Sequence, residues 1–140
     1  MVLLAPNSWK FRKQFRGRLT GKASTGNYVA FGDYGLKATT SGYLTNRQIE
    51  SARKVIVRVT RKFGRIWLRV FPDLPFTKKG LEMPMGSGKG DVDTYRTRIK
   101  PGKVLFEISG VDKAAAAAIF KEAGYKLPVK TVMVERGEIK

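Results

Sequence analysis

The chain has 140 residues, 42% of them hydrophobic, and its 28 Lys and Arg against 11 Asp and Glu give a formal net charge of +17. That length fits one folded domain, and so large a positive excess indicates a polyanionic partner such as nucleic acid. The sequence contains no Cys and no His, which excludes disulfides, thiolate chemistry and Cys/His zinc sites, and we expect no metal and no other cofactor.

Most of the positive charge lies in the first half of the chain, which carries a net +13 against +4 in the second half. Residues 1–27 contain no acid and no sustained apolar period, which predicts an extended basic arm. Its rings, Trp9, Phe11 and Phe15, either stack on unpaired bases or pack on the protein core, and both readings stay open. Its cations are candidates for RNA phosphate contacts: Lys10, Arg12, Lys13, Arg16, Arg18 and Lys22.

Residues 28–37 contain two short apolar runs on either side of Gly32-Asp33. A two-residue connection that starts with glycine is typical of a type II′ turn. The sequence therefore predicts a β-hairpin here.

The stretch 44–71 predicts an amphipathic helix followed by a strand. Thr45 and Gln48 have the spacing of a capping box, and Leu44 before them could act as a hydrophobic staple. One apolar face would be buried, formed by Ile49, Ala52, Ile56, Val59 and Phe63. The opposite face would present a row of cations, Arg47, Lys54, Arg58, Arg61 and Lys62. Solvated faces normally mix signs, so this row favours a polyanion over plain exposure to solvent.

Gly64 has the expected place of the C′ residue that ends this helix. Beyond it, Ile66, Leu68 and Val70 alternate with Trp67 and Arg69, as in a strand with one buried face.

Residues 72–91 predict a long loop, because they hold three prolines, four glycines and three lysines, among them Lys79 and Lys89. The segment MGSGKG lacks the spacing of a phosphate-binding Walker A motif, since Met83 and Gly90 stand where Gly and Ser or Thr are required. A glycine-rich backbone with lysine can still approach RNA closely. A plain flexible hairpin tip is the alternative, and the sequence barely separates the two.

The last third of the chain alternates strands with one helix. Residues 94–99 predict a strand, Pro101-Gly102 a turn, and residues 104–108 an alternating strand. Asp112 is the expected N-cap of an alanine-rich helix closed by Gly124, and residues 129–135 predict a final strand before a polar tail at 136–140. These elements indicate a single α+β domain over residues 1–140, with two helices on one side of a mostly antiparallel sheet.

Seven segments of the chain, taken in order and together, resemble the bacterial-type large ribosomal subunit protein L-sixteen family. They are KFRKQFRGR (10–18), GNYVAFGDYGLKA (26–38), LTNRQIESAR (44–53), RIWLRVFPD (65–73), MGSGKG (85–90), PGKVLFEISGV (101–111) and KLPVKT (126–131). Such a resemblance implies a non-enzymatic α+β protein that binds large-subunit ribosomal RNA and helps to shape the aminoacyl-tRNA site near the peptidyl transferase region.

The family motifs carry over onto named positions of this chain. Lys10, Arg12, Lys13, Arg16 and Arg18 match the arm motif, and Arg47 and Arg53 match the helix motif. Met85, Gly86, Gly88, Lys89 and Gly90 match a loop that the resemblance implies is close to tRNA, and Lys79 lies just before it. The family commonly has an arginine before the methionine-glycine of this loop, hydroxylated in some bacteria; here Pro84 stands in that place, so this modification cannot occur there.

We therefore expect a structural, non-enzymatic constituent of the large ribosomal subunit. Its expected partners are large-subunit ribosomal RNA, tRNA and other large-subunit proteins, with no membrane and no homo-oligomer. The expected RNA-binding set comprises Lys10, Arg12, Lys13, Arg16, Arg18, Lys22, Arg47, Arg53, Lys54, Arg58, Arg61 and Lys62. The lack of a targeting presequence favours a cytoplasmic, bacterial ribosome over an organellar one.

Three alternatives stay open at this point. The first is a free RNA chaperone or ribosome-assembly factor, which would bind RNA without remaining on the mature particle. The second is a carboxylate–metal nuclease that uses Asp91 and Asp93, although acids beside Gly90 are also typical of a turn. The third is a membrane-surface role, which the commitment of the helix's apolar face to a core disfavours.

Overall fold

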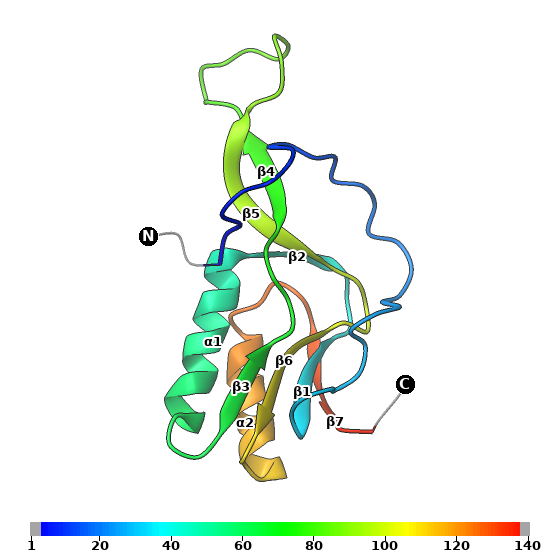
Figure 1. Cartoon of the computed structure of the whole chain (residues 1–140), viewed down its shortest axis with the longest axis vertical. Coiled ribbons are helices and arrows are strands. Elements are labelled where there is room, and N and C mark those ends of the chain that lie inside the picture. The colour runs from blue at the N-terminus through cyan, green and yellow to red at the C-terminus, as the bar shows by residue number, and fades with distance from the viewer. Residues whose placement is uncertain (1–3, 138–140) are drawn as a thin grey trace.

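The computed structural model describes residues 4–137, so residues 1–3 of the predicted arm and 138–140 of the predicted tail lie outside it. The described chain forms two helices and seven strands (Figure 1). In order they are β1 (Tyr34–Ala38), β2 (Gly42–Thr45), α1 (Asn46–Thr60), β3 (Arg65–Leu68), β4 (Leu74–Lys78), β5 (Asp91–Ile99), β6 (Val104–Ser109), α2 (Lys113–Gly124) and β7 (Thr131–Glu135).

The strands build two antiparallel sheets, where the sequence predicted one. The first has the order β3-β6-β1-β7, and the second has the order β2-β5-β4. The helices pack against each other, with α1 also on β3 and α2 on β1 and β7. The α+β class with both helices on one side is confirmed, and the β4–β5 hairpin projects away from this body (Figure 1).

Helix α1 begins as predicted but buries a different face. Thr45 and Gln48 form the complete capping box, which confirms that prediction. Ile49, Ala52 and Ile56 are buried as expected, and Thr60 joins them by donating its hydroxyl to the Ile56 carbonyl at 2.9 Å. Val59 and Phe63 are exposed, so their assignment to the buried face was wrong. Phe63 follows the end of the helix, and Val59 lies at the margin of the buried stripe.

The prediction that Gly64 is the C′ residue was also wrong. The helix caps at Arg61 in a right-handed conformation, and Gly64 follows a turn. A Cβ on Gly64 would lie 2.6 Å from the Ser109 carbonyl oxygen, which is closer than van der Waals contact allows. Glycine therefore serves here to let β3 start close against the end of β6.

Strand β6 lies inside the four-stranded sheet and is buried on both faces. Leu105 and Glu107 are as inaccessible as the predicted core residues Val104, Phe106 and Ile108. The alternation of buried and exposed positions expected for this strand is therefore wrong. A register shift in the pairing with β1 interrupts the alternation, so Leu105 joins the core cluster, while residues 28–33 cover Glu107 on the sheet face opposite the helices.

The predicted hairpin at residues 28–37 does not form. Strand β1 pairs with β6 and β7, while residues 28–31 belong to no strand. The N–H groups of Ala30, Phe31 and Gly32 donate instead to the carboxylate of Glu107, from a position far along the chain.

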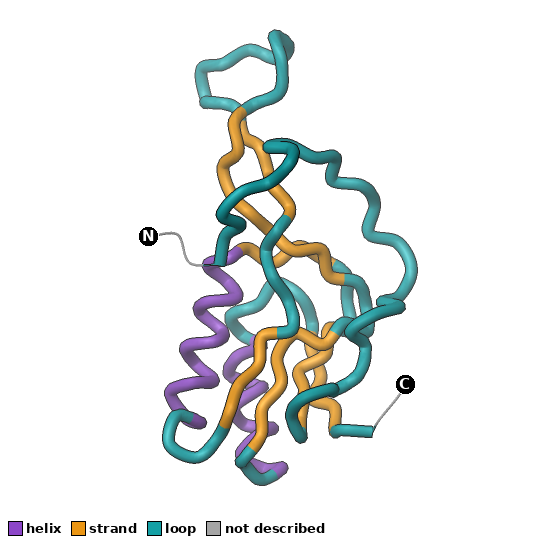
Figure 2. The backbone as a smooth tube through the Cα atoms, in the orientation of Figure 1, coloured by secondary structure: helices purple, strands orange, loops and turns teal. Residues whose placement is uncertain are grey.

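Residues 72–91 contain a strand that the sequence did not predict. Strand β4 forms the edge of its sheet, where Pro75 opposite Tyr95 is tolerated because an edge strand leaves one row of N–H groups unpaired. The true loop is therefore residues 79–90, at the tip of the β4–β5 hairpin (Figure 2). The remaining predicted strands correspond to β3, β5, β6 and β7, and α2 begins at its predicted cap, where Asp112 accepts from the Ala115 N–H at 3.3 Å.

Candidate nucleic-acid interface

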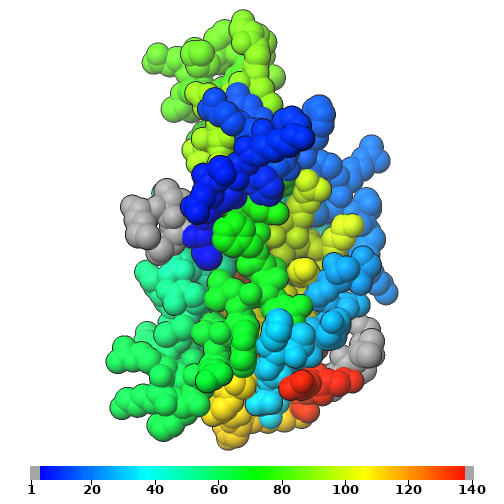
Figure 3. All heavy atoms as spheres, in the orientation of Figure 1, coloured from blue at the N-terminus to red at the C-terminus, as the bar shows by residue number. Residues whose placement is uncertain are grey.

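The basic arm lies across the β4–β5 hairpin instead of hanging free. Its described part, residues 4–27, contains no helix or strand, and Figure 3 shows its atoms covering the hairpin. Lys13 donates from Nζ to the Lys89 carbonyl at 3.2 Å, and Lys89 donates from Nζ to the Gln14 carbonyl at 3.0 Å. These reciprocal hydrogen bonds join the arm to the end of loop 79–90.

A buried ring fixes the arm a few residues further on. The guanidinium carbon of Arg16 lies 4.4 Å from the centroid of Phe76 on β4, and that of Arg96 on β5 lies 4.5 Å from the same centroid. Tyr43 packs edge-on against the Phe76 ring at 4.9 Å. Because cation–π contacts hold a guanidinium through its face, its edge N–H groups stay available to phosphates.

Two cations of this surface were missed from the sequence. Arg96 and Arg98 flank buried Thr97 on β5, so they share the face of the sheet that carries the arm. Arg98 approaches the Phe15 carbonyl with Nη2 at 3.5 Å. Their alternation with Thr97 was the available signal, but nothing local indicated that the arm covers this strand.

The aromatic side chains of the arm point outward. Trp9, Phe11 and Phe15 are all exposed, Phe15 by 92%. The ammonium group of Lys89 lies 5.6 Å from the Phe15 centroid, and that of Lys10 lies 5.5 Å from the Phe11 centroid. The alternative that these rings pack on the core is therefore wrong, and they are free to stack on a ligand.

Helix α1 carries the second set of predicted cations away from the arm. The helix starts next to the hairpin sheet and runs to the far end of the molecule (Figure 1). Four predicted cations are exposed and form no ion pair within residues 4–137: Arg47, Lys54, Arg61 and Lys62. Arg58 is also exposed and lies 3.8 Å from Glu122 of α2.

Arg53 differs from the other helix cations because it forms an ion pair with Glu50, one helical turn earlier. The hydrogen bond from Arg53 holds the pKa of Glu50 below its ordinary value, and the same bond raises the pKa of Arg53. An RNA phosphate would have to compete with Glu50 for this guanidinium.

Loop 79–90 is closed from within by a lysine. The ammonium group of Lys79 donates to the carbonyl oxygens of Pro84 and Gly86. Gly86, Ser87 and Gly88 follow with positive φ, which makes a tight turn at the tip. Both lysines predicted to be close to tRNA therefore bind the protein's own backbone, whereas Met85 is exposed.

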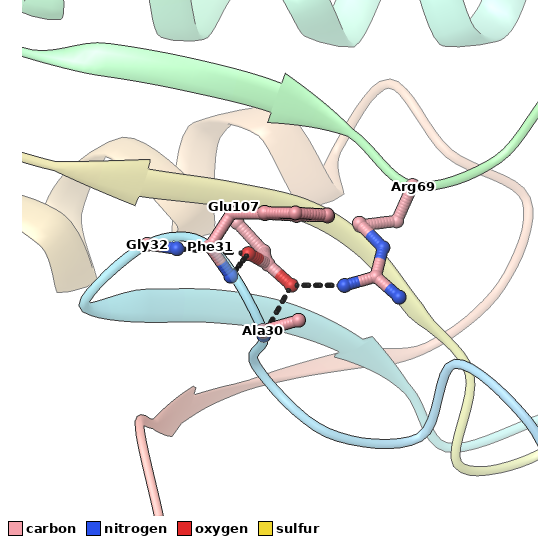
Figure 4. Close-up of polar contacts among 5 residues, drawn as sticks. All are labelled: Ala30, Phe31, Gly32, Arg69 and Glu107. Carbon is pink, nitrogen blue, oxygen red and sulfur yellow. Dashed lines mark hydrogen bonds and ion pairs between the residues drawn. The ribbon is translucent and has the colours of Figure 1, made fainter.

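Glu107 is a buried acid that was not singled out from the sequence. It lies on the face of the four-stranded sheet opposite the helices (Figure 4). The carboxylate of Glu107 accepts from the N–H groups of Ala30 (2.9 Å), Phe31 (2.7 Å) and Gly32 (2.9 Å) and from Arg69 at 2.8 Å (Figure 4). Burial by itself would raise the pKa of Glu107, but these hydrogen bonds and the Arg69 charge outweigh it, so the pKa lies below its ordinary value. An acid between apolar residues of the strand VLFEIS was the available signal.

The nuclease alternative gains no support from the described residues. Asp91 and Asp93 are both exposed at the start of β5, and residues 4–137 contain no group of three Asp, Glu, His or Cys side chains that could hold a metal ion. No helix in this part of the chain is long and apolar enough to cross a membrane.

Comparison with known proteins covers nearly the whole chain. Residues 6–134 match the family model described as ribosomal protein L16p/L10e. A Sulfurihydrogenibium protein named large ribosomal subunit protein uL16 is 51% identical over 99% of this chain and 100% of its own length. A protein of the same name from Staphylococcus haemolyticus is 47% identical over 98% of this chain and 95% of its own length. A Porphyra purpurea protein named large ribosomal subunit protein uL16c is 51% identical over 98% of this chain and 99% of its own length.

Proposed function

Because the chain belongs to the ribosomal protein L16p/L10e family, we propose that it is a structural protein of the large ribosomal subunit, bound to ribosomal RNA and to other subunit proteins. The family is one of ribosomal proteins and not of enzymes, so the protein is assigned no catalytic role. The observation that carries the proposal is the docking of the arm on the β4–β5 hairpin, which gathers cations distant in sequence onto one surface.

We attribute RNA binding to phosphate neutralisation by two regions. The arm region comprises the arm cations Lys10, Arg12, Lys13, Arg16, Arg18 and Lys22 together with Arg96 and Arg98 of β5. The helix region comprises the α1 cations Arg47, Arg53, Lys54, Arg58, Arg61 and Lys62. The two regions lie on different elements of the fold (Figure 1), so each can bind its own RNA segment.

The salt dependence of binding tests this mechanism. When a protein neutralises several phosphates, the logarithm of its binding constant falls linearly with the logarithm of the salt concentration. The slope is about −0.7 to −0.9 per phosphate contact. Arg12→Gln and Arg18→Gln, both at exposed positions, should each make the slope for a large-subunit rRNA fragment shallower by roughly one contact. Lys126→Gln, at an exposed position outside both regions, is the control. A shallow slope for the unchanged protein contradicts the mechanism.

We further propose that loop 79–90 approaches tRNA. The loop is the most distant projection from the body (Figure 1), and Lys79 keeps its tip folded through the Pro84 and Gly86 carbonyls. Since Lys79 and Lys89 are engaged within the protein, the surface offered to tRNA is the glycine backbone and Met85. Lys79→Met should weaken tRNA binding to the aminoacyl site of otherwise intact subunits; unchanged binding contradicts this role for the loop.

A free RNA chaperone or assembly factor is the competing function, and occupancy separates the two. A structural protein is present at one copy in mature subunits and forms no homo-oligomer there, whereas an assembly factor is confined to precursor particles. Copy number in the mature particle therefore decides between them.

A further inference from the structure

We infer that Phe31, Trp67 and Arg69 form a stacking platform for an unpaired RNA base, on the face of the four-stranded sheet opposite the helices. The inference rests on the proposed function for the presence of RNA. It concerns a surface separate from the arm and from loop 79–90, on elements that the predicted RNA-binding set does not include.

The Phe31 ring contacts both Trp67 and Arg69. Ile66 and Leu68 pack against the core, so Trp67 and Arg69, which alternate with them, face away from it. The Phe31 ring lies 6.3 Å from the Trp67 ring with 21° between their planes, and the guanidinium carbon of Arg69 lies 5.0 Å from the Phe31 centroid. Phe31 is therefore held by an aromatic ring and a guanidinium that both belong to the segment 67–69.

The Phe31 side chain remains largely exposed to solvent. Phe31 is 58% exposed although it contacts both Trp67 and Arg69. A phenyl ring that is held by its neighbours and still exposed can stack on any base, because every base has a π-face.

Glu107 holds the platform rigid from below (Figure 4). One carboxylate binds the backbone that carries Phe31, through three N–H groups, and also the guanidinium that supports its ring. Gly32 fixes the same segment against β6, since a Cβ there would lie 2.6 Å from the Ile108 carbonyl oxygen. Such a ring is ordered before any ligand arrives, which lowers the entropy lost on binding.

The surrounding charges favour RNA over an apolar protein surface. Arg69 is paired with Glu107, so it contributes a flat face and not a free charge. Arg65 is exposed and lies two positions before Trp67, on the same face of β3. Arg136 is exposed, and its N–H donates to the Asp33 carbonyl at 2.9 Å, close to Phe31 in the chain. These two arginines can bind the phosphates that flank a stacked base.

Chemical probing of ribosomal RNA in purified large subunits tests the platform. Subunits would contain the unchanged protein, Phe31→Tyr, Phe31→Leu or Phe31→Ala, and a 2′-hydroxyl acylating reagent would report the mobility of each nucleotide. We expect one unpaired nucleotide to be protected with the unchanged protein and Phe31→Tyr, and to become at least about threefold more reactive with Phe31→Leu and Phe31→Ala. Phe31→Leu retains apolar bulk, so it separates stacking from loss of packing.

Tyr125→Ala, which removes another exposed ring at the end of α2, is the control and should leave that nucleotide unchanged. Subunits that contain each Phe31 variant at one copy and show the unchanged pattern at every nucleotide would overturn the platform and leave the proposed function intact. Cross-linking of position 31 to a neighbouring protein, with no change in the RNA, would also overturn it. Absence of the unchanged protein from the subunits would instead remove the proposed function, and the platform with it.

Discussion

Lys89 and Gln14 are 75 positions apart, yet the ammonium group of the first donates to the backbone carbonyl of the second at 3.0 Å. The bond spans the end of loop 79–90 and the middle of the arm. The position of the arm therefore depends on a residue of the loop. The end of the loop depends in turn on the arm, because Lys13 donates to the Lys89 carbonyl at 3.2 Å. Arm and loop are therefore parts of one surface.

Removing the Lys89 ammonium group should release the arm. Lys89→Met keeps an unbranched side chain of nearly the same length but has no donor. Losing a charge-assisted hydrogen bond at an exposed site corresponds to about 1 kcal/mol. We expect tryptic cleavage after Lys13 and Arg16 to accelerate by roughly fivefold, because the protease needs the arm released from the hairpin. Lys79→Met, which opens the loop tip without touching the arm, is the matched control. Equal cleavage rates in the two variants would show that Lys89 does not hold the arm.

Replacing the ring of Phe76 should destabilise the hairpin sheet. Phe76→Leu keeps an apolar side chain in this buried position but removes the π-face that Arg16 and Arg96 contact and the edge contact with Tyr43. We expect the free energy of unfolding to fall by about 2 kcal/mol in urea titration. Phe63→Leu, at an exposed position, should change it by less than about 0.5 kcal/mol. A similar small change for Phe76→Leu would mean that these ring contacts contribute little.

Low pH should lower the free energy of unfolding, because it protonates Glu107. The folded-state pKa of this carboxyl is lowered because its backbone hydrogen bonds and Arg69 outweigh burial. Its stabilisation is therefore complete above the pKa of an unfolded glutamate, about 4.3, and is lost as the pH falls through the lower folded-state value. Glu107→Gln should lower the free energy of unfolding by about 3 kcal/mol at pH 7 and flatten its dependence on pH below about 4. An unchanged slope in the variant would assign the acid sensitivity to other groups.

Gly110 should tolerate alanine poorly. It has a φ of +83°, and a Cβ there would clash with the Phe63 carbonyl oxygen where the end of β6 meets the turn after α1. We expect Gly110→Ala to lower the free energy of unfolding by about 3 kcal/mol, from left-handed backbone strain and the clash together. Gly21→Ala is the control, because Gly21 has a φ of +81° and open space around it, and should cost about 1 kcal/mol. Equal losses would mean that the close approach is easily relieved.

The fold was predictable where neighbouring residues determine it. The capping box of Thr45 and Gln48 and the Asp112 cap depend on residues within one helical turn, so the pattern is visible in the sequence. The supposed hairpin at residues 28–37 failed because its N–H groups bind Glu107, which no local pattern reveals. Strand β4 was hidden by prolines that only an edge strand accommodates.

The candidate interface was predictable in its composition but not in its arrangement. The charge of the arm and of α1 can be read directly from the sequence, and the structure shows most of these side chains exposed. Two missed features depend on the fold: the use of Lys89 to hold the arm and the addition of Arg96 through the Phe76 ring. The pairing of Arg53 with Glu50 was also missed, although its spacing within one helical turn is visible in the sequence. The first two join residues that are well separated in the sequence, and composition does not specify such contacts.

The most direct test of the ribosomal role is the copy number of this protein in mature large subunits. A lysate is sedimented through sucrose gradients at moderate and high salt, and the protein is quantified by mass spectrometry against other large-subunit proteins. One copy per mature subunit, retained at moderate salt, is the expected result. Confinement to precursor particles or to light fractions would contradict the structural role and favour an assembly factor.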